Sequence, residues 1–337
     1  MKIIVDAMGG DNAPEAIVKG ALIAHEKYGV DIMLVGRMAD ILRVLESCGA
    51  SNLPDGVEVR DASEVIEIAD DPATAWKVKK DSSLTVGLNL LKAGEGDAFV
   101  SAGSTGALLA GATLIVKRIR GIRRAALCPL IPTAGGKMLL IDCGANSECT
   151  SEYLMQFAYL GSYYARRALG ITHPRVALLN IGAEPEKGDG VRKETYGLLR
   201  KADEAGRIRF IGNIEANSAM MGGADVVVAD GFSGNIMLKT MEGTAKFLLK
   251  ELKAMFLSNA KTKIAAAMVK KDLSNLRKVL DPSEVGGTAF LGITKPVIKA
   301  HGSSDARAIA NAILRAKEYV ESGFVDDIKE NINLMKL

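Results

Sequence analysis

Apolar and polar positions alternate along the chain in blocks, and this pattern predicts short buried strands separated by amphipathic helices. The expected strands are Ile3–Asp6, Asp31–Val35, Val57–Arg60, Ala98–Val100, Leu127–Pro132, Lys137–Asp142, Val176–Ile181, Ile208–Ile211, Asp225–Ala229 and Pro296–Ala300. The expected helices are Glu15–Tyr28, Met38–Ser47, Ser83–Lys92, a helix from Ala107 onward, Ser151–Leu169, Val191–Ala205, a helix from Ile236 onward and Ala306–Ser322. This alternation is typical of an α/β protein with a mostly parallel sheet covered on both faces.

No stretch rich in Gly, Ser or Pro divides the chain into two halves. With 337 residues, 48% of them hydrophobic, the chain is long enough to bury a large core. We therefore expect one compact unit over residues 1–337. The first residues lead directly into a strand, and the four cysteines form no Cys-x-x-Cys pair, so we expect no signal peptide and a cytoplasmic protein.

Six of the expected strands end in a loop that contains glycine together with Asp, Asn, Ser or His. These loops follow Val5, Val100, Ile141, Ile181, Ala229 and Ala300. In open α/β sheets, ligands bind at the carboxyl ends of the strands. The loop Ser101–Gly106 also leads straight into a helix, whose first N–H groups and dipole favour an anion. One such loop is often only a tight turn, but the repetition predicts a ligand site where the loops converge.

Several common kinds of site are missing from the sequence. It has no Gly-x-Gly-x-x-Gly followed by a ribose-binding acid, no Gly-x-x-x-x-Gly-Lys-Ser/Thr and no Gly-x-Ser-x-Gly. The three histidines are far apart, and no His or Cys cluster indicates a metal. A net charge of +3 is too small to argue for nucleic acid. These absences favour direct transfer onto a bound anion, catalysed by positioning and fixed charges without a cofactor.

Two side chains at strand ends are best able to hold phosphate or a developing oxyanion: Lys187 and His301. Each also has a plainer interpretation. Lys187 could be a solvated loop lysine, and His301 could cap a helix or lie in the core.

Seven motifs follow one another along nearly the whole chain and carry a resemblance to a known family. They are DAMGGDNAP (Asp6–Pro14), SAGSTGA (Ser101–Ala107), DCGAN (Asp142–Asn146), LLNIGAEPEKG (Leu178–Gly188), ADGFSGNIMLKTMEG (Ala229–Gly243), GGTAFLG (Gly286–Gly292) and IKAHGSSDA (Ile298–Ala306). Together they resemble the bacterial acyl-acyl carrier protein:phosphate acyltransferases of phospholipid synthesis, the PlsX family. One departure is Ser104, where the family loop usually has Asn, because Ser reaches less far toward an anion.

The resemblance implies transfer of a fatty acyl group from acyl carrier protein to inorganic phosphate, which gives acyl phosphate. It also implies a cytosolic homodimer in peripheral contact with membrane lipid. The implied fold is a three-layer α/β/α unit with a large mixed, mainly parallel sheet, like that of isocitrate and isopropylmalate dehydrogenases. The implied site residues are Lys187, Asp230 and His301 for catalysis and Asp6, Ser104, Thr105, Gly106, Asn146, Ser233 and Asn235 for substrate binding.

In this chemistry, phosphate is held beside a thioester carbonyl. Helix starts at Ser104–Ala107 and at Asn235–Ile236 would supply N–H groups, and Lys187 would supply a positive charge. Asp230 or His301 would orient phosphate or move a proton to the leaving thiol. Asp230 could instead simply cap the helix that follows it.

Two stretches bear on partners. Lys117–Arg124 is basic, so it could dock an acidic carrier protein by charge complementarity, or it could be a solvated loop. Leu238–Leu280 is rich in helix formers with a break near Ser258–Asn259, which predicts a long helical hairpin inserted in the unit. Its apolar stripes predict subunit packing, and its basic tip predicts contact with anionic lipid.

Other functions remain open at this level. A phosphate acyltransferase could use acyl-CoA as its donor. A dehydrogenase of the same fold would need a dinucleotide and a divalent metal. A non-catalytic membrane scaffold would leave the six polar strand ends without a use.

Overall fold

The structure is a computed structural model that describes residues 1–49, 52–273, 276 and 286–335. The strands of one sheet are β1 (Lys2–Asp6), β2 (Asp31–Gly36), β3 (Val57–Asp61), β4 (Ala98–Ser101), β5 (Ala126–Cys128), β11 (Thr288–Leu291) and β12 (Val297–Lys299). Their order is β3-β2-β1-β4-β12-β11-β5. The pairs from β3 to β12 are parallel, whereas β11 is antiparallel to both of its neighbours.

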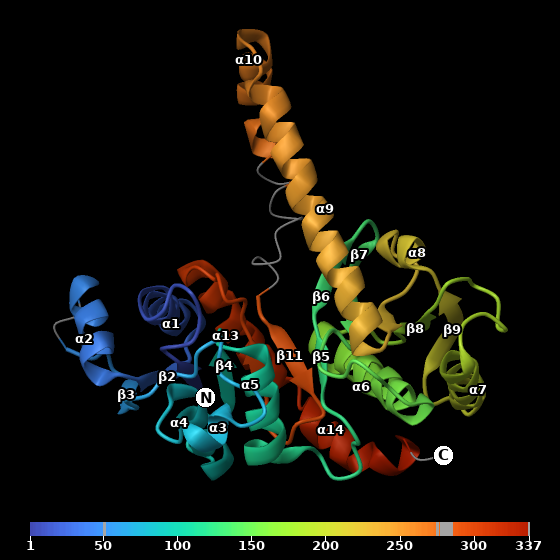
Figure 1. The fold of residues 1–337 in the computed structure, drawn as a ribbon, viewed down its shortest axis with the longest axis horizontal. Coiled ribbons are helices and arrows are strands. Elements are labelled where there is room, and N and C mark those ends of the chain that lie inside the picture. Colours follow the sequence, from blue (N-terminus) through green and yellow to red (C-terminus); the bar gives the residue numbers. More distant parts are fainter. Residues whose placement is uncertain (50–51, 274–275, 277–285, 336–337) are drawn as a thin grey trace.

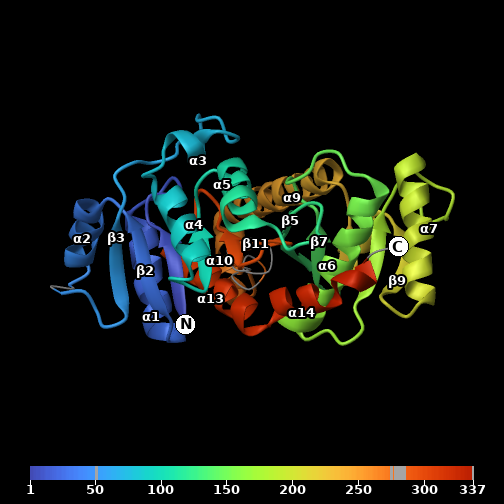
Figure 2. The same cartoon turned by 90° about the horizontal axis from the view of Figure 1, so that it is seen from below.

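A second sheet lies beside the first (Figures 1 and 2). Its strands are β6 (Leu130–Thr133), β7 (Gly136–Ile141), β8 (Arg175–Leu179), β9 (Arg209–Ile214) and β10 (Val226–Val228). They lie in the order β6-β7-β10-β8-β9, and all pairs except β6 with β7 are parallel. The α/β class and the mainly parallel pairing predicted from the sequence are therefore confirmed. The division into two sheets was not predicted.

The helices account for most of the remaining chain. They are α1 (Glu15–Tyr28), α2 (Met38–Ser47), α3 (Ala75–Val78), α4 (Ser83–Ala93), α5 (Thr105–Gly111) with its π-helical continuation η1 (Ala112–Lys117), α6 (Ser151–Leu169), α7 (Gly190–Glu204), α8 (Ala216–Met220), α9 (Gly231–Leu257), α10 (Ala260–Met268), α13 (Ala306–Glu321), α14 (Phe324–Asn331) and the 3-10 helix η2 (Ile332–Met335). The bounds expected for α1, α2 and α6 are confirmed.

Alternate residues of each central strand face opposite helical layers, as expected for parallel strands buried on both faces. In β1, Ile3 belongs to the same core cluster as residues of α1 and α13. Ile4 belongs to a second cluster with residues of α4 and α5. In the second sheet, Leu139 packs with α6, and Leu140 packs with Ala219 of α8 and Met237 of α9. Each sheet is thus the middle layer of a three-layer arrangement.

Among the predicted elements whose bounds differ from the structure, two differ in ways that matter for the sheets and the site. The apolar run Leu127–Pro132 was expected to be one strand, but it is divided at Pro129 between β5 of one sheet and β6 of the other. Proline has no N–H for a ladder hydrogen bond, so the run changes sheets there. The helix expected from Ile236 begins at Gly231, because the Asp230 carboxylate accepts a hydrogen bond from the Ser233 N–H and caps it.

The helical hairpin is described in part. Helix α9 ends at Leu257, and α10 follows after a break at Ser258–Asn259, as predicted. Figure 1 shows α9 projecting from the body of the protein with α10 at its far end. The end of the predicted second limb lies outside the described residues. In the part of the chain that is described, no helix is long and apolar enough to span a membrane.

The largest core cluster contains residues from both sheets, such as Val5 and Leu178. That a single unit extends over residues 1–337 stays a prediction.

Candidate active site

The six glycine-containing loops follow strands that are neighbours in the two sheets. Three follow β1, β4 and β12, which are adjacent in the first sheet. The other three follow β7, β10 and β8, which are adjacent in the second sheet. Because these neighbouring strands run parallel, their carboxyl ends lie at one edge of each sheet. The structure therefore gathers the predicted loops in two groups of three.

In the first group, Asp6 is a buried carboxylate that joins the ends of β1 and β4. Its Oδ2 accepts a hydrogen bond from the Ser101 hydroxyl at 2.6 Å, and its Oδ1 accepts one from the Met8 N–H at 3.2 Å. Burial raises the pKa of Asp6, while hydrogen bonds from Ser101 and Ser83 act in the opposite direction. Both oxygens are occupied within the protein, so direct substrate binding by Asp6 stays a prediction.

The next strand end in this group carries two basic side chains. Lys299 is the last residue of β12 and is 9% exposed, and His301 follows in an exposed loop where its Nδ1 contacts the Ser303 hydroxyl at 3.0 Å. Partial burial lowers the pKa of His301, and the positive charges of Lys239 and Lys299 lower it further against the attraction of Glu242. Lys239 and Glu242 belong to α9, so this helix passes near the β12 end.

The loop after β4 contains three of the predicted binding residues. Ser104 is the N-cap of α5, with its hydroxyl 3.5 Å from the Ala107 N–H, and Thr105 is exposed. A Cβ at Gly106 would lie 2.7 Å from the Pro72 Cβ. The absence of a side chain at Gly106 is therefore explained by packing against Pro72, and contact of all three residues with substrate stays a prediction.

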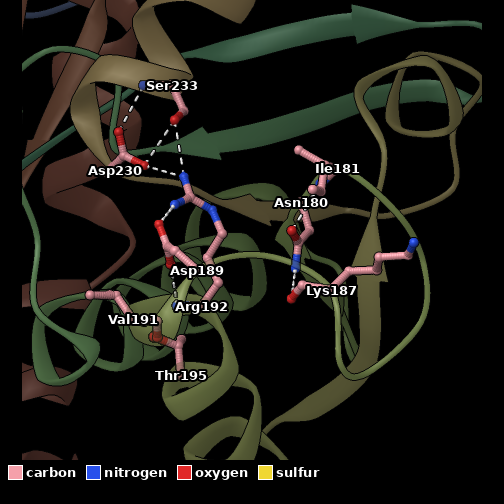
Figure 3. Close-up of polar contacts among 9 residues, drawn as sticks. All are labelled: Asn180, Ile181, Lys187, Asp189, Val191, Arg192, Thr195, Asp230 and Ser233. Carbon is pink, nitrogen blue, oxygen red and sulfur yellow. Dashed lines mark hydrogen bonds and ion pairs between the residues drawn. The ribbon is translucent and has the colours of Figure 1, made fainter.

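In the second group, Arg192 holds two carboxylates together (Figure 3). Its guanidinium contacts Asp189 at 2.7 Å, Asp230 at 2.5 Å and the Ser233 hydroxyl at 3.1 Å. The Ser233 hydroxyl also donates to Asp230 at 2.9 Å. Asp230 and Ser233, predicted from separate roles, therefore lie in one ion-paired cluster. The Asp230 carboxylate is engaged by Arg192 and by its capping bond, so proton transfer by Asp230 stays a prediction.

Lys187 lies on the same side of the second sheet, but its ammonium is separate from this cluster. Figure 3 shows its side chain pointing away from Arg192 and Asp230, and the residue is exposed. The Lys187 carbonyl accepts a hydrogen bond from the Asn180 side chain at 3.0 Å, which fixes the loop. A role of the ammonium in binding phosphate stays a prediction.

Asn146 belongs to a loop organised by Asp142. The buried Asp142 carboxylate accepts hydrogen bonds from the N–H groups of Leu127, Ala145 and Asn146 and from the Asn146 side chain. The Asn146 amide also donates to the Ala125 carbonyl at 2.8 Å. Burial raises the pKa of Asp142, and the backbone hydrogen bonds oppose this. The Asn146 side chain is thus used within the protein, and its contact with substrate stays a prediction.

The position of Asn235 corrects one expectation. Because α9 begins at Gly231, Asn235 lies in the second turn, and the N–H groups of Asn235 and Ile236 are not at a free helix start. The side chain of Asn235 is exposed and lies beside Gly144. If it binds substrate, it does so through its amide group.

A cavity of about 640 Å³ opens beside the Arg192 cluster. Its lining comes from the ends of β8, from α8 and from the first turns of α9. The apolar lining residues are Leu179, Ile181, Met220, Ile236, Met237 and Met241, and the polar ones include Asp189, Arg192 and Ser233. Cavities of this size and character bind small organic ligands.

The comparisons with known proteins agree with the resemblance in the motifs. A family profile described as "Fatty acid synthesis protein" matches residues 1–327. A phosphate acyltransferase of Acetivibrio thermocellus is 44% identical over 338 residues, covering 100% of this chain and 98% of that protein. A phosphate acyltransferase of Thermoanaerobacter pseudethanolicus is 46% identical over 336 residues, covering 99% of this chain and 98% of that protein. The chain belongs to the fatty acid synthesis protein family.

Solved structures support the fold assigned to this family member. A phosphotransacetylase from Streptococcus pyogenes superposes with a TM-score of 0.64 at 17% identity, over 95% of this chain and 94% of that chain. A 4-hydroxythreonine-4-phosphate dehydrogenase from Klebsiella pneumoniae gives 0.54 at 15% identity, over 95% and 99%. At such identities the similarity concerns the fold alone.

Three residues of this family member were missed at the sequence level: Arg192, Asp142 and Lys299. Asp142 and Lys299 each stand at the end of an apolar strand, and a charged residue in such a position was a usable signal. Arg192 follows the helix-capping Asp189 by three residues, but nothing in the sequence placed it beside Asp230.

Proposed function

We propose that the chain is a phosphate acyltransferase that moves a fatty acyl group from acyl carrier protein to inorganic phosphate. The observation that carries this proposal is the cavity beside the Arg192 cluster, because its lining combines apolar side chains that suit an alkyl chain with polar side chains that suit a thioester group. The proposal also rests on membership in a family whose relatives are named phosphate acyltransferases.

The cavity suits an acyl chain in shape and chemistry. Three methionines, Met220, Met237 and Met241, line its apolar part. Methionine is unbranched and polarizable, so these side chains adapt to a flexible alkyl chain. The Arg192 cluster would lie near the thioester end, where polar groups fix orientation.

The first group of strand ends suits the anion. Lys299, His301 and Lys239 of α9 act electrostatically on one another there. The positive charges are those of the two lysines, and cations placed where negative charge develops lower the barrier of acyl transfer. We assign phosphate to this side of the site.

A covalent cysteine intermediate is disfavoured by the thiols themselves. Cys143 is 1% exposed, and burial raises its pKa well above the ordinary value. Burial also raises the pKa of Cys128, and that of Cys149 to about 12. Such thiols are poor nucleophiles at neutral pH. Direct attack of phosphate on the thioester fits these residues better.

The decisive assay is release of carrier-protein thiol from palmitoyl-acyl carrier protein, with acyl phosphate trapped by hydroxylamine. Thiol release that requires phosphate and yields hydroxamate is expected. The same assay with palmitoyl-CoA tests the alternative donor. A folded protein that releases no thiol from either donor would overturn the proposal.

We place the docking of the acidic carrier protein at the basic loop before β5. Arg118, Arg123 and Arg124 surround a cavity of about 340 Å³ together with Tyr153. Arg124 stacks over the Tyr153 ring, with 5.5 Å between the guanidinium carbon and the ring centroid, and Arg123 pairs with Glu152. These contacts hold the arginines at the surface, where they can attract an anionic partner.

Charge reversal of this loop tests the docking surface. The double variant Arg123→Glu, Arg124→Glu is expected to raise KM for palmitoyl-acyl carrier protein about tenfold at low salt, with kcat little changed. The KM for palmitoyl-CoA, if it is a donor, serves as the control and should move much less. An unchanged KM for the carrier-protein donor at low salt would exclude this surface.

We further propose a cytoplasmic homodimer in peripheral contact with membrane lipid. The far part of the hairpin exposes large apolar side chains, namely Phe247, Leu248, Met255, Ile264 and Met268. Lysines lie among them in the sequence. Apolar stripes of this kind are buried by a second subunit, a lipid surface or both.

A further inference from the structure

Lys299 is a charged side chain at the end of an otherwise apolar strand. Its neighbours Ile298 and Ala300 are 0% and 1% exposed, and Lys299 itself is 9% exposed. Its Nζ donates hydrogen bonds to the Ala102 carbonyl at 3.1 Å and to the Ala300 carbonyl. The ammonium therefore lies between the carboxyl ends of β4 and β12, within the first group of strand ends.

The surroundings leave this ammonium incompletely paired. An ammonium has three N–H donors, and two of them are used by these carbonyls. In the described part of the chain, no carboxylate forms an ion pair with it, although Asp6 and Asp11 attract it from farther away. Lys239 of α9 repels it. The positive charge of Lys299 also lowers the pKa of His301.

Burial lowers the pKa of Lys299 to about 8, with the charge of Lys239 acting in the same direction and Asp6 and Asp11 opposing it. A thiol has an ordinary pKa near 8.5. Proton transfer between groups of similar pKa is efficient near neutral pH. Lys299 is thus suited to protonate a thiolate and then to recover its proton.

We propose that Lys299 is the general acid that protonates the leaving thiolate during acyl transfer to phosphate. This inference rests on the proposed function. Among the groups predicted for this role, Asp230 is engaged by Arg192 and Ser233, and His301 lies in an exposed loop with its Nδ1 on Ser303. The Lys299 side chain is buried, and its ammonium keeps one N–H donor that the two carbonyls do not use.

An oxygen of hydrogen phosphate attacks the thioester carbonyl carbon, and a C–O bond forms while the C–S bond breaks. The Lys299 ammonium gives its proton to the thiolate sulfur. The hydroxyl of the acyl phosphate then gives its proton to the neutral amine and restores the ammonium. No oxidant, reductant or further reactant is needed.

Two acyl donors with different leaving groups test the assignment. One is palmitoyl-acyl carrier protein, whose alkyl thiolate needs a proton. The other is the palmitoyl thioester of 5-thio-2-nitrobenzoate, whose aromatic thiolate leaves without one. The wild type, Lys299→Arg and Lys299→Met are compared, with Lys295→Arg in the loop before β12 as the matched control.

The Lys299→Arg variant keeps a cation but cannot release its proton. We expect its kcat with the carrier-protein donor to fall at least about 100-fold, while kcat with the aromatic donor stays close to the wild-type value. Lys299→Met should show the same dependence on the donor, with a higher KM for phosphate in addition. Lys295→Arg should match the wild type.

The pH profile gives a second readout that a purely structural role would not change. The acid form of Lys299 is present below its pKa, so wild-type kcat/KM for the carrier-protein donor should fall as pH rises above about 8. This alkaline limb should be absent in Lys299→Arg, because arginine stays protonated.

Equal losses with both donors, or full activity of Lys299→Arg and Lys299→Met with carrier protein, would overturn the assignment and leave the proposed function standing. A folded wild type that is inactive with both donors would overturn the proposed function and this inference with it.

Discussion

Replacing Asp142 by alanine is expected to lower the free energy of unfolding by about 4 kcal/mol. The Asp142 side chain is fully buried and accepts four hydrogen bonds, at 2.9 and 3.2 Å on Oδ1 and at 2.7 and 2.9 Å on Oδ2. Removing the carboxylate leaves buried N–H donors without partners, which costs more than the loss of the bonds themselves. One of the donors is the Leu127 N–H of β5, so the variant also weakens the link between the two sheets.

Denaturant unfolding followed by circular dichroism measures this effect. Asp55→Ala, at an exposed carboxylate in the loop before β3, is the control and should change stability by less than about 0.5 kcal/mol. Asp142→Asn keeps one oxygen acceptor, so its loss of unfolding free energy should lie between those of Asp142→Ala and Asp55→Ala. A loss for Asp142→Ala no larger than that of the control would show that the hydrogen bonds are not the source of stability here.

Filling the cavity beside α9 is expected to lower activity with a long acyl chain much more than activity with a short one. Thr240 is exposed on α9 and lines the cavity, so Thr240→Trp places an indole in the space without disturbing the core. We expect kcat/KM for palmitoyl-acyl carrier protein to fall about 10- to 100-fold. The value for the hexanoyl donor should change little, because a short chain does not reach the filled part.

Thr244→Trp is the matched control for this experiment. Thr244 is exposed on the next turn of α9, and it is not among the residues that line the cavity. The subunit state of each variant is measured by sedimentation. If Thr240→Trp slows both donors equally and also shifts the subunit equilibrium, then the cavity receives a second copy of this chain rather than an acyl chain.

The sequence pattern predicted most helices and strands because interactions between residues close in sequence determine where they form. The helices Glu15–Tyr28 and Ser151–Leu169 have both an apolar face and clear ends, and each closes at a glycine in the left-handed region, Gly29 or Gly170. The assignment of strands to sheets is different. It depends on which segments pair when they are far apart in sequence. In the run 127–132, the only local indication of a change of sheet was Pro129, which has no N–H.

The site shows the same division between local and distant effects. The composition of the loops predicted where these strands end, and Asp230 and Ser233 lie together as their motif implies. The motif did not reveal that Arg192, from another helix, neutralises Asp230. Nor could it show that Lys239 would stand near Lys299, because that approach depends on the path of α9 past the first sheet.

Helix α9 begins at the capping residue Asp230 in the second group of strand ends and continues without interruption for 27 residues. At 1.5 Å per residue, it is about 40 Å long. It therefore acts as a spacer of fixed length. From Lys239, which lies near Lys299, to the end of α9 at Leu257 the rise is about 27 Å, so a lipid surface met by the α9–α10 tip would be held about one bilayer hydrocarbon thickness, ~30 Å, from the chemistry. An acyl phosphate formed at the base of this helix is released at a distance from such a surface, so its delivery to lipid becomes a separate step from its synthesis.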